Sequence, residues 1–97
     1  MSTIIVAVLT YVRPLEEVDA HLPSHVEWLK RGYSDGVFLA SGRRVPRTGG
    51  VILARGEDRD AIEARLREDP FQRLGLAQVE IIPFEPSMAV DAFADFI

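Results

Sequence analysis

The chain has 97 residues, with 15 acidic and 11 basic side chains and a formal net charge of −4. A chain of this length makes one domain, which we place at residues 1–97. The negative charge argues against a nucleic-acid-binding protein that holds phosphates with a basic surface. The sequence contains no cysteine, which excludes disulfides, thiolate metal sites and a thiol nucleophile.

Apolar runs predict no membrane-spanning segment. The longest of them, Ile4–Leu9, is far too short to cross a bilayer. The N-terminal residues also lack the basic stretch of a signal peptide. We therefore expect a cytoplasmic location without membrane contact.

The first element is a strand over Thr3–Tyr11, a β-branched run without polar alternation. Such a strand is buried on both faces. Two further apolar runs, Val37–Ala40 and Val51–Ala54, flank a loop rich in Gly, Pro, Thr and Arg. This pattern predicts a strand–loop–strand unit whose strands are also apolar on both faces.

Between the first strand and this unit, Leu15–Tyr33 has the spacing of an amphipathic helix. Its apolar stripe consists of Leu15, Val18, Leu22, Val26, Leu29 and Tyr33. Pro23 lies inside the stretch and removes one backbone donor. The proline therefore either kinks one long helix or starts a second helix, and the sequence leaves both alternatives open.

The second half of the chain predicts a helix, a strand and a short terminal helix. Asp58 is the expected N-cap of the helix, which ends at Asp69-Pro70 because a residue before proline avoids the helical region. Phe71–Leu76 forms a packed connection to the last strand, Ala77–Phe84, whose Pro83 suits an edge position. Ser87 is expected to cap the final helix, with one apolar face made of Ala89, Ala92, Phe93 and Phe96.

The order β-α-β-β-α-β predicts an α+β protein with a ferredoxin-like split βαβ sandwich and an extra short C-terminal helix. Two main helices cover only one face of a four-stranded sheet. The apolar second face therefore needs another cover, and the simplest one is a second copy of the chain. We expect a homodimer whose sheets face each other, with assembly beyond the dimer left open.

Two residues are candidates for acid–base chemistry. His25 lies at the border of the apolar stripe, where an imidazole is half desolvated and still exchanges protons near neutral pH. Asp69 lies at a predicted helix exit, where the helix dipole disfavours its charge. Both helices of the predicted fold pack on the same sheet face, so the two side chains can meet.

Other chemical sites are less well supported. His21 and His25 have the i, i+4 spacing of metal ligands, but Pro23 disturbs the helix that this spacing requires, and we predict no metal site. Arg43, Arg44 and Arg47 form a cationic loop that either holds a carboxylate or phenolate or is a solvated turn. Ser41 has no neighbouring base, which argues against a serine hydrolase, and the glycines of the loop match no nucleotide-binding motif.

Four segments together resemble the YciI-like family. They are His25-Val-Glu-Trp-Leu, Gly36-Val-Phe-Leu-Ala-Ser-Gly42, Gly49-Gly50-Val-Ile and Asp69-Pro70-Phe71 before Gly75-Leu76. The order and spacing agree from about residue 4 to residue 85. The resemblance implies a ferredoxin-like fold assembled as a dimeric α/β barrel, with His25 and Asp69 as the active-site pair. Related dimeric barrels, muconolactone isomerase among them, act on small lactones, phenols or quinone-like rings.

The chain departs from the family at Ser41-Gly42-Arg43, where Ala-Gly-Pro is usual. This departure enlarges the expected role of the arginines in choosing a substrate. We expect Ser41, Arg43, Arg47 and Phe71 to contact the substrate.

The sequence thus favours a small cofactor-free enzyme of isomerase or lyase type that acts on a small cyclic or aromatic substrate with a His25–Asp69 acid–base pair. The alternative is a non-catalytic dimeric module that binds a small ligand or a protein. A third option, a haem- or oxygen-using barrel as in distant relatives, would show a Soret or flavin absorbance band.

Overall fold

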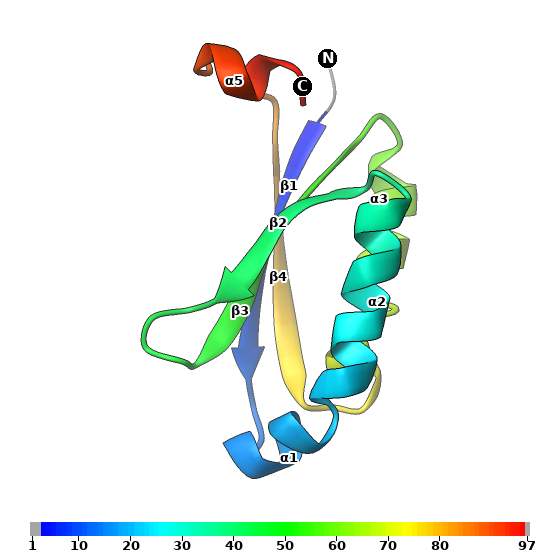
Figure 1. Ribbon diagram of the computed structural model, residues 1–97, viewed down its shortest axis with the longest axis vertical. Helices are drawn as coiled ribbons and strands as arrows, with labels where there is room; N and C mark the ends of the chain where they lie inside the picture. Colours follow the sequence, from blue (N-terminus) through cyan, green and yellow to red (C-terminus); the bar gives the residue numbers. More distant parts are fainter. Residues whose placement is uncertain (1–2, 97) are drawn as a thin grey trace.

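The computed structural model describes residues 3–96 and has the predicted ferredoxin-like order of elements (Figure 1). Its strands and helices are β1 (Thr3–Tyr11), α1 (Leu15–Ala20), α2 (Leu22–Ser34), β2 (Phe38–Arg43), β3 (Gly49–Gly56), α3 (Arg59–Leu66), α4 (Pro70–Arg73), β4 (Ala77–Phe84) and α5 (Asp91–Ala94). The first and last strands coincide with the predicted ranges.

The four strands form one antiparallel sheet in the order β2-β3-β1-β4. The strand β4 is therefore an edge strand, as Pro83 predicted. Successive side chains alternate between the faces, so Ile5, Ala7 and Leu9 of β1 lie on one face and are buried. Figure 1 shows α2 and α3 on one side of the sheet and α1 at its lower end. Val18 of α1, Trp28 of α2 and Ile62 of α3 share one core with these strand residues.

Pro23 starts a second helix rather than kinking a long one. α1 ends at Ala20, and α2 begins at Leu22 with the proline in its first turn. The first turn of a helix tolerates proline because its backbone donors have no intrahelical partner. The restart changes which face of α2 is buried: Trp28 and Gly32 are in the core, whereas the predicted stripe residue Tyr33 is exposed.

The strands of the hairpin are longer than predicted, and only residues 44–48 connect them. Ser41, Gly42 and Arg43 pair with Ile52, Val51 and Gly50 and so belong to β2 rather than to a loop. Gly49 begins β3 where the backbone of β1 comes very close. A Cβ atom at this position would lie 1.8 Å from the carbonyl oxygen of Leu9, so only glycine fits.

Two expectations about helix ends are corrected. The stretch after α3 is not a plain connection, because α4 forms within it and Asp69 is the N-cap of α4. The backbone N–H groups at a helix start favour a carboxylate, which is the reverse of the predicted helix-exit setting. Ser87 does not cap the terminal helix, because α5 begins only at Asp91 after Val90. By contrast, Asp58 caps α3 as predicted and accepts a hydrogen bond from the Ala61 N–H at 3.1 Å.

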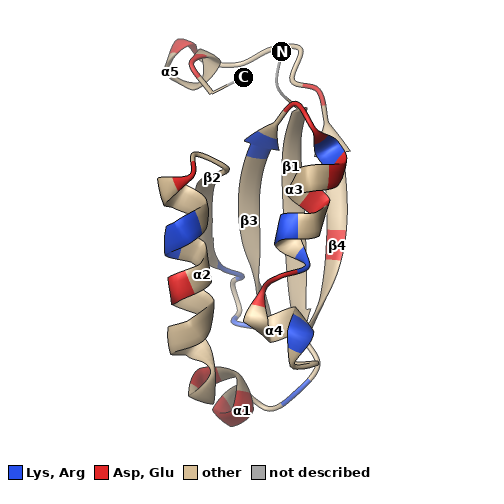
Figure 2. Ribbon diagram, turned by 90° about the vertical axis from the view of Figure 1, so that its right-hand side faces the viewer, with Lys and Arg blue, Asp and Glu red and all other residues tan. Residues whose placement is uncertain are grey.

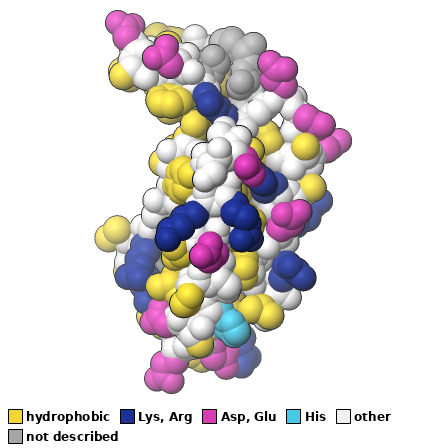
Figure 3. Space-filling view, turned by 45° about the vertical axis from the view of Figure 1, so that its right-hand side comes forward, with side chains coloured by type: hydrophobic (Ala, Val, Ile, Leu, Met, Phe, Trp, Pro, Cys, Tyr) yellow, Lys and Arg dark blue, Asp and Glu magenta, His cyan; other side chains and the backbone are white. Residues whose placement is uncertain are grey.

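Among residues 3–96, the second face of the sheet carries no helix apart from α5 at one end (Figure 1). Phe96, near α5, lies under the guanidinium of Arg55 on β3. Below α5 the surface is hollowed, and hydrophobic side chains line the hollow (Figure 3). Ile82 and Phe84 of β4 are 43% and 46% exposed on this face. Within residues 3–96, no helix combines the length and the apolar character needed to cross a membrane.

Candidate functional site

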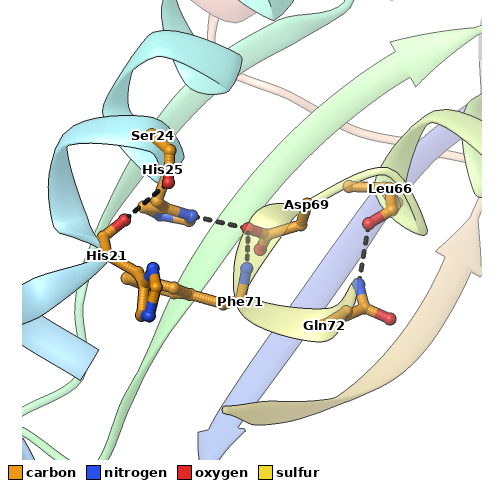
Figure 4. A network of polar contacts seen from close by, with 7 residues as sticks. All are labelled: His21, Ser24, His25, Leu66, Asp69, Phe71 and Gln72. Atoms are coloured by element: carbon orange, nitrogen blue, oxygen red, sulfur yellow. Dashed lines mark hydrogen bonds and ion pairs between the residues drawn. The ribbon is translucent and has the colours of Figure 1, made fainter. Parts of the chain in front are cut away.

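His25 and Asp69, which are 44 positions apart in the sequence, are in direct contact (Figure 4). The Nδ1 atom of His25 lies 2.7 Å from Oδ1 of Asp69. The side chain of His25 is 13% exposed and that of Asp69 is fully buried. The contact forms because α2 and the α3–α4 connection pack on the same face of the sheet, as the fold required.

The local chain holds Asp69 in one orientation. Its Oδ1 atom accepts a second hydrogen bond from the backbone N–H of Phe71 at 2.9 Å, which is the N-cap bond of α4. Pro70 suits the first position of that helix. The other carboxylate oxygen, Oδ2, is buried and has no hydrogen-bond partner within residues 3–96. The carboxylate is therefore fixed by α4 and directed at the imidazole.

The orientation of the imidazole follows from these contacts. A carboxylate accepts hydrogen bonds, so the contact with Asp69 assigns a proton to Nδ1, and in the neutral imidazole Nε2 is then the acceptor. The ring of His25 stacks on Phe71 with a centroid distance of 4.0 Å and an angle of 5°. The ring centroid of Trp28 lies 5.8 Å from that of His25, with the two planes tilted by 36°. The stacking fixes the plane of the ring, and the hydrogen bond to Asp69 fixes which edge of the ring faces the carboxylate.

His25 lines a cavity of about 240 Å³ between α2 and the sheet. Most of its wall is apolar, and polar groups occur at few points. Its lining includes Leu9, Tyr11, Leu22, His25, Val26, Leu29, Ser41, Arg43, Gly50 and Phe71. Part of the predicted apolar stripe of α2 thus lines a cavity instead of filling the core.

Of the four residues expected to contact a substrate, three line this cavity: Ser41, Arg43 and Phe71. The hydroxyl of Ser41 is 2.7 Å from the hydroxyl of Tyr33. Arg47 does not belong to the lining. Its guanidinium pairs with Asp19 of α1 at 2.5 Å and lies 5.8 Å from the ring centre of Tyr11.

The ion pair between Arg47 and Asp19 shifts the pKa of both side chains. The hydrogen bond from Arg47, with a smaller contribution from the charge of Arg43, lowers the pKa of Asp19 below its usual value. The hydrogen bond from Asp19 likewise raises the pKa of Arg47. Figure 2 shows the acidic residues of α1 in red close to the arginine-bearing segment that joins β2 and β3. The third arginine, Arg44, donates to the hydroxyl of Thr10 at 3.0 Å.

Tyr11 is a site residue that the sequence analysis missed. It lines the cavity and meets the ring of Phe71 edge to face, with centroids 6.0 Å apart. The signal was the two-residue period of β1, which places Tyr11 on the same face as Leu9. The aromatic side chain thus follows the buried positions at the end of the strand.

No group of three or more His, Asp or Glu side chains suited to a metal ion occurs in the described part of the chain. His21 is exposed and lies between α1 and α2, where its backbone carbonyl accepts a hydrogen bond from the hydroxyl of Ser24.

The fold and the site together define a class: small ferredoxin-like proteins with a buried His–Asp pair at an apolar cavity. The chain belongs to the YCII-related domain family, whose model matches residues 4–85. This agrees with the resemblance found in the sequence. Among curated proteins, no significant match to the chain is found.

Solved structures similar to the chain include the following two. One is 5-chloro-2-hydroxyhydroquinone dehydrochlorinase (TftG) from Burkholderia phenoliruptrix in complex with 2,5-dihydroxybenzoquinone. It has a TM-score of 0.71 and 16% identity, and the match covers 84% of this chain and 93% of that chain. The other is SnoaB, a cofactor-independent oxygenase from Streptomyces nogalater, with a TM-score of 0.53 and 16% identity over 93% of this chain and 97% of that chain. At these identities the similarity establishes the ferredoxin-like fold.

Proposed function

We propose that the protein is a cofactor-free enzyme of isomerase or lyase type that acts on a small cyclic or aromatic compound. The observation that carries the proposal is the imidazole of His25 at the wall of an apolar cavity, with its Nδ1 atom 2.7 Å from Asp69. In this proposal the other ring nitrogen, Nε2, faces the substrate, and His25 is the general base and acid. Asp69 orients the ring and stabilises the imidazolium that forms when Nε2 takes a proton.

An isomerisation or an elimination suits such a pair. In an isomerisation, Nε2 removes a proton from one atom of the substrate and returns it to another. In an elimination, Nε2 removes a proton and a leaving group departs from the neighbouring atom with its bonding electrons. Both reactions use one group that takes and gives a proton near neutral pH, which is the role of histidine.

The size of the cavity supports a small ring as the substrate. An apolar cavity of about 150 Å³ holds benzene, so about 240 Å³ has room for one ring with small substituents. The two similar structures agree with this choice. TftG is a dehydrochlorinase of a chlorinated hydroxyhydroquinone and was solved with a ring ligand, and SnoaB is a cofactor-independent oxygenase.

A homodimer is part of the proposal. The bare sheet face carries exposed Ile82 and Phe84, and it also includes Val6, Val8 and Leu53, which pair across the sheet on that face. Contiguous apolar surface of this kind marks an interface. A second copy placed sheet to sheet would cover it and leave the His25 cavities on the outer, helical sides. A mass in solution of twice 10.8 kDa is expected, and a mass equal to one chain at micromolar concentration contradicts the dimer.

The catalytic test is a turnover assay with small rings, starting from 5-chloro-2-hydroxyhydroquinone and followed by release of chloride, together with hydroxylated quinones and lactones followed by absorbance. His25→Gln removes the base while keeping a polar side chain of similar length. Loss of general acid–base catalysis costs about 10²- to 10⁴-fold in rate, and we expect a loss in this range. Full activity of the His25→Gln variant contradicts the mechanism.

The alternative function is a non-catalytic module that binds a small ligand. The same cavity and the buried Asp69 favour it, because a hydrogen bond between Asp69 and His25 would hold the imidazole in this place even if its only role were structural. Binding of ring compounds without turnover of any of them, unchanged by His25→Gln, would select this alternative.

A further inference from the structure

Arg43 differs from the two other arginines of the hairpin because its side chain is not held by another residue of the protein. Arg44 donates to Thr10, and Arg47 pairs with Asp19. Within residues 3–96, Arg43 has no ion pair or side-chain hydrogen bond, and it lines the cavity. The charge of Arg43 lowers the pKa of Asp19, but the carboxylate of Asp19 is already paired with Arg47.

The register of the sheet places Arg43 on the cavity side. Arg43 pairs with Gly50 of β3, and Gly50 pairs with Leu9 of β1. Paired residues project to the same face, and Leu9 belongs to the face that the helices cover. Gly50 carries no side chain, so nothing on β3 at this level separates Arg43 from the interior of the cavity.

The cation and the acid–base pair reach the cavity from different elements, Arg43 from β2 and His25 from α2. Neighbouring strands are about 4.8 Å apart, so the backbone of β2 at Arg43 lies about 10 Å from that of β1 at Leu9. On the far side, Tyr11 and Phe71 are in contact, and His25 stacks on Phe71. A single ring beside His25 therefore reaches toward Arg43 with one substituent.

Ser41 provides a second polar contact at the same end. It lies two residues before Arg43 on β2, and two-residue spacing places both side chains on one face. Tyr33 is 2.7 Å from its hydroxyl oxygen. When Tyr33 donates this hydrogen bond, the proton of Ser41 is left for an anion held by the guanidinium.

We propose that Arg43 is the specificity-determining residue of the cavity and selects monocyclic ring compounds that carry a carboxylate on the side away from the reacting atom. This inference rests on the proposed function, because it assigns the substrate class of the same site. The planar guanidinium matches a carboxylate with two parallel N–H donors. The apolar wall holds the ring, and the guanidinium of Arg43 attracts an anion to a protein whose net charge is −4. Figure 3 shows a group of Lys or Arg side chains at the edge of the molecule toward which the β2–β3 hairpin projects in Figure 1.

The test compares two probes of nearly equal shape, 4-hydroxybenzoate and 4-hydroxybenzamide, by isothermal titration calorimetry at low salt. The wild-type protein should bind the carboxylate about tenfold more tightly than the amide, as expected for a partly exposed charge-assisted pair. Arg43→Gln should remove this preference and change the affinity for the amide less than about twofold, within the range of a surface change. Arg43→Lys should keep part of the preference, because the charge remains and the two-donor geometry is lost.

Arg44→Gln is the matched control. It removes the same charge at the next residue, and the side chain of Arg44 is already bonded to Thr10. It should leave the preference for the carboxylate intact. Equal affinities of the wild type for both probes, no binding of either probe, or an unchanged preference in Arg43→Gln would each overturn the inference.

His25→Gln separates this inference from the proposed function. Arg43 and His25 belong to different elements and share no hydrogen bond within residues 3–96, since His25 is bonded to Asp69, so His25→Gln should keep the preference for the carboxylate. If it does so while turnover proves independent of His25, the substrate class stands and the enzymatic mechanism fails. If turnover depends on His25 but Arg43→Gln keeps the preference, the mechanism stands and the substrate class is wrong.

Discussion

Removal of the Asp69 carboxylate should destabilise the protein far more than removal of an ordinary helix cap. Asp69→Ala deletes the N-cap bond of α4, and such a loss costs about 1 kcal/mol. It also leaves the Nδ1–H of His25 without an acceptor at a position that is only 13% exposed. An unsatisfied buried donor costs about 1–3 kcal/mol. We therefore expect a loss of about 2–4 kcal/mol in the free energy of unfolding, or roughly 10–25 °C in the melting temperature for a domain of this size.

A double-mutant cycle isolates the histidine contact from the cap. His25→Phe keeps a ring against Phe71 and removes the donor, so Asp69 is left as an unpaired buried carboxylate and the single variant is also destabilised. The double variant lacks both partners and loses mainly the cap. The coupling energy between the two positions should therefore be about 2–3 kcal/mol, at the upper end for residues in contact.

The assay is equilibrium urea denaturation at one fixed protomer concentration, because assembly would make stability depend on concentration. Trp28 is the single tryptophan of the chain and lies 5.8 Å from His25, so its fluorescence reports directly on this region. Asp58→Ala is the matched control, since Asp58 caps α3 with one backbone bond and no histidine. It should cost only about 1 kcal/mol. A coupling energy below about 0.5 kcal/mol, the limit of additivity for independent sites, would refute the conclusion that the two side chains act as one buried pair.

Three further predictions concern charge, packing and assembly. Arg47 lowers the pKa of Asp19, so this ion pair should contribute fully to stability at pH values above the ordinary carboxyl pKa of 3.8. The contribution should be lost as the pH falls through the lower pKa that Asp19 has in the folded protein. In acid titration of stability, Asp19→Asn should lack this pH-dependent loss. Gly49→Ala should cost about 2 kcal/mol or more in chemical denaturation, since overpacking against a backbone is poorly relieved, whereas Gly42→Ala, which meets no atom within 4 Å, should change stability by less than about 0.5 kcal/mol. Leu53→Lys places a charge on the bare sheet face and should halve the mass measured by light scattering, and an unchanged dimer mass would locate the interface elsewhere.

The sequence predicted the secondary structure best where the local signals were strong. β1 and β4 have the predicted bounds because β-branched runs end at clear turn residues. Pro23 marked a helix start but left open whether one helix or two were present, since a proline is compatible with both a kink and a first turn. Ser41–Arg43 belong to β2 rather than to the loop because they pair with β3. Pairing between strands depends on the tertiary fold, and the residues of the turn do not specify it alone.

The candidate site was only partly predictable, for a related reason. His25 and Asp69 were chosen from a helical border position, a turn and the resemblance to the YciI-like family. The residues themselves could say no more than that the fold lets the two side chains meet. The setting of Asp69 was wrong, because the four-residue helix α4 is too short to give a periodic signal. The cavity was invisible, since apolar residues such as Leu22 and Leu29 have the same spacing whether they fill a core or line an open space.

This ambiguity of apolar spacing explains why the departure at Ser41-Gly42-Arg43 carries information that the apolar pattern lacks. A hydrophobic residue on the helix-covered face has a structural reason to be there, because burial alone stabilises the fold. An arginine on that face has no such reason, since its charge must be either paired or solvated. Arg44 and Arg47 meet this requirement within the protein, through Thr10 and Asp19. Arg43 meets it only through water or a bound anion, and the neighbouring cavity with its apolar wall makes the anionic ring the more specific partner.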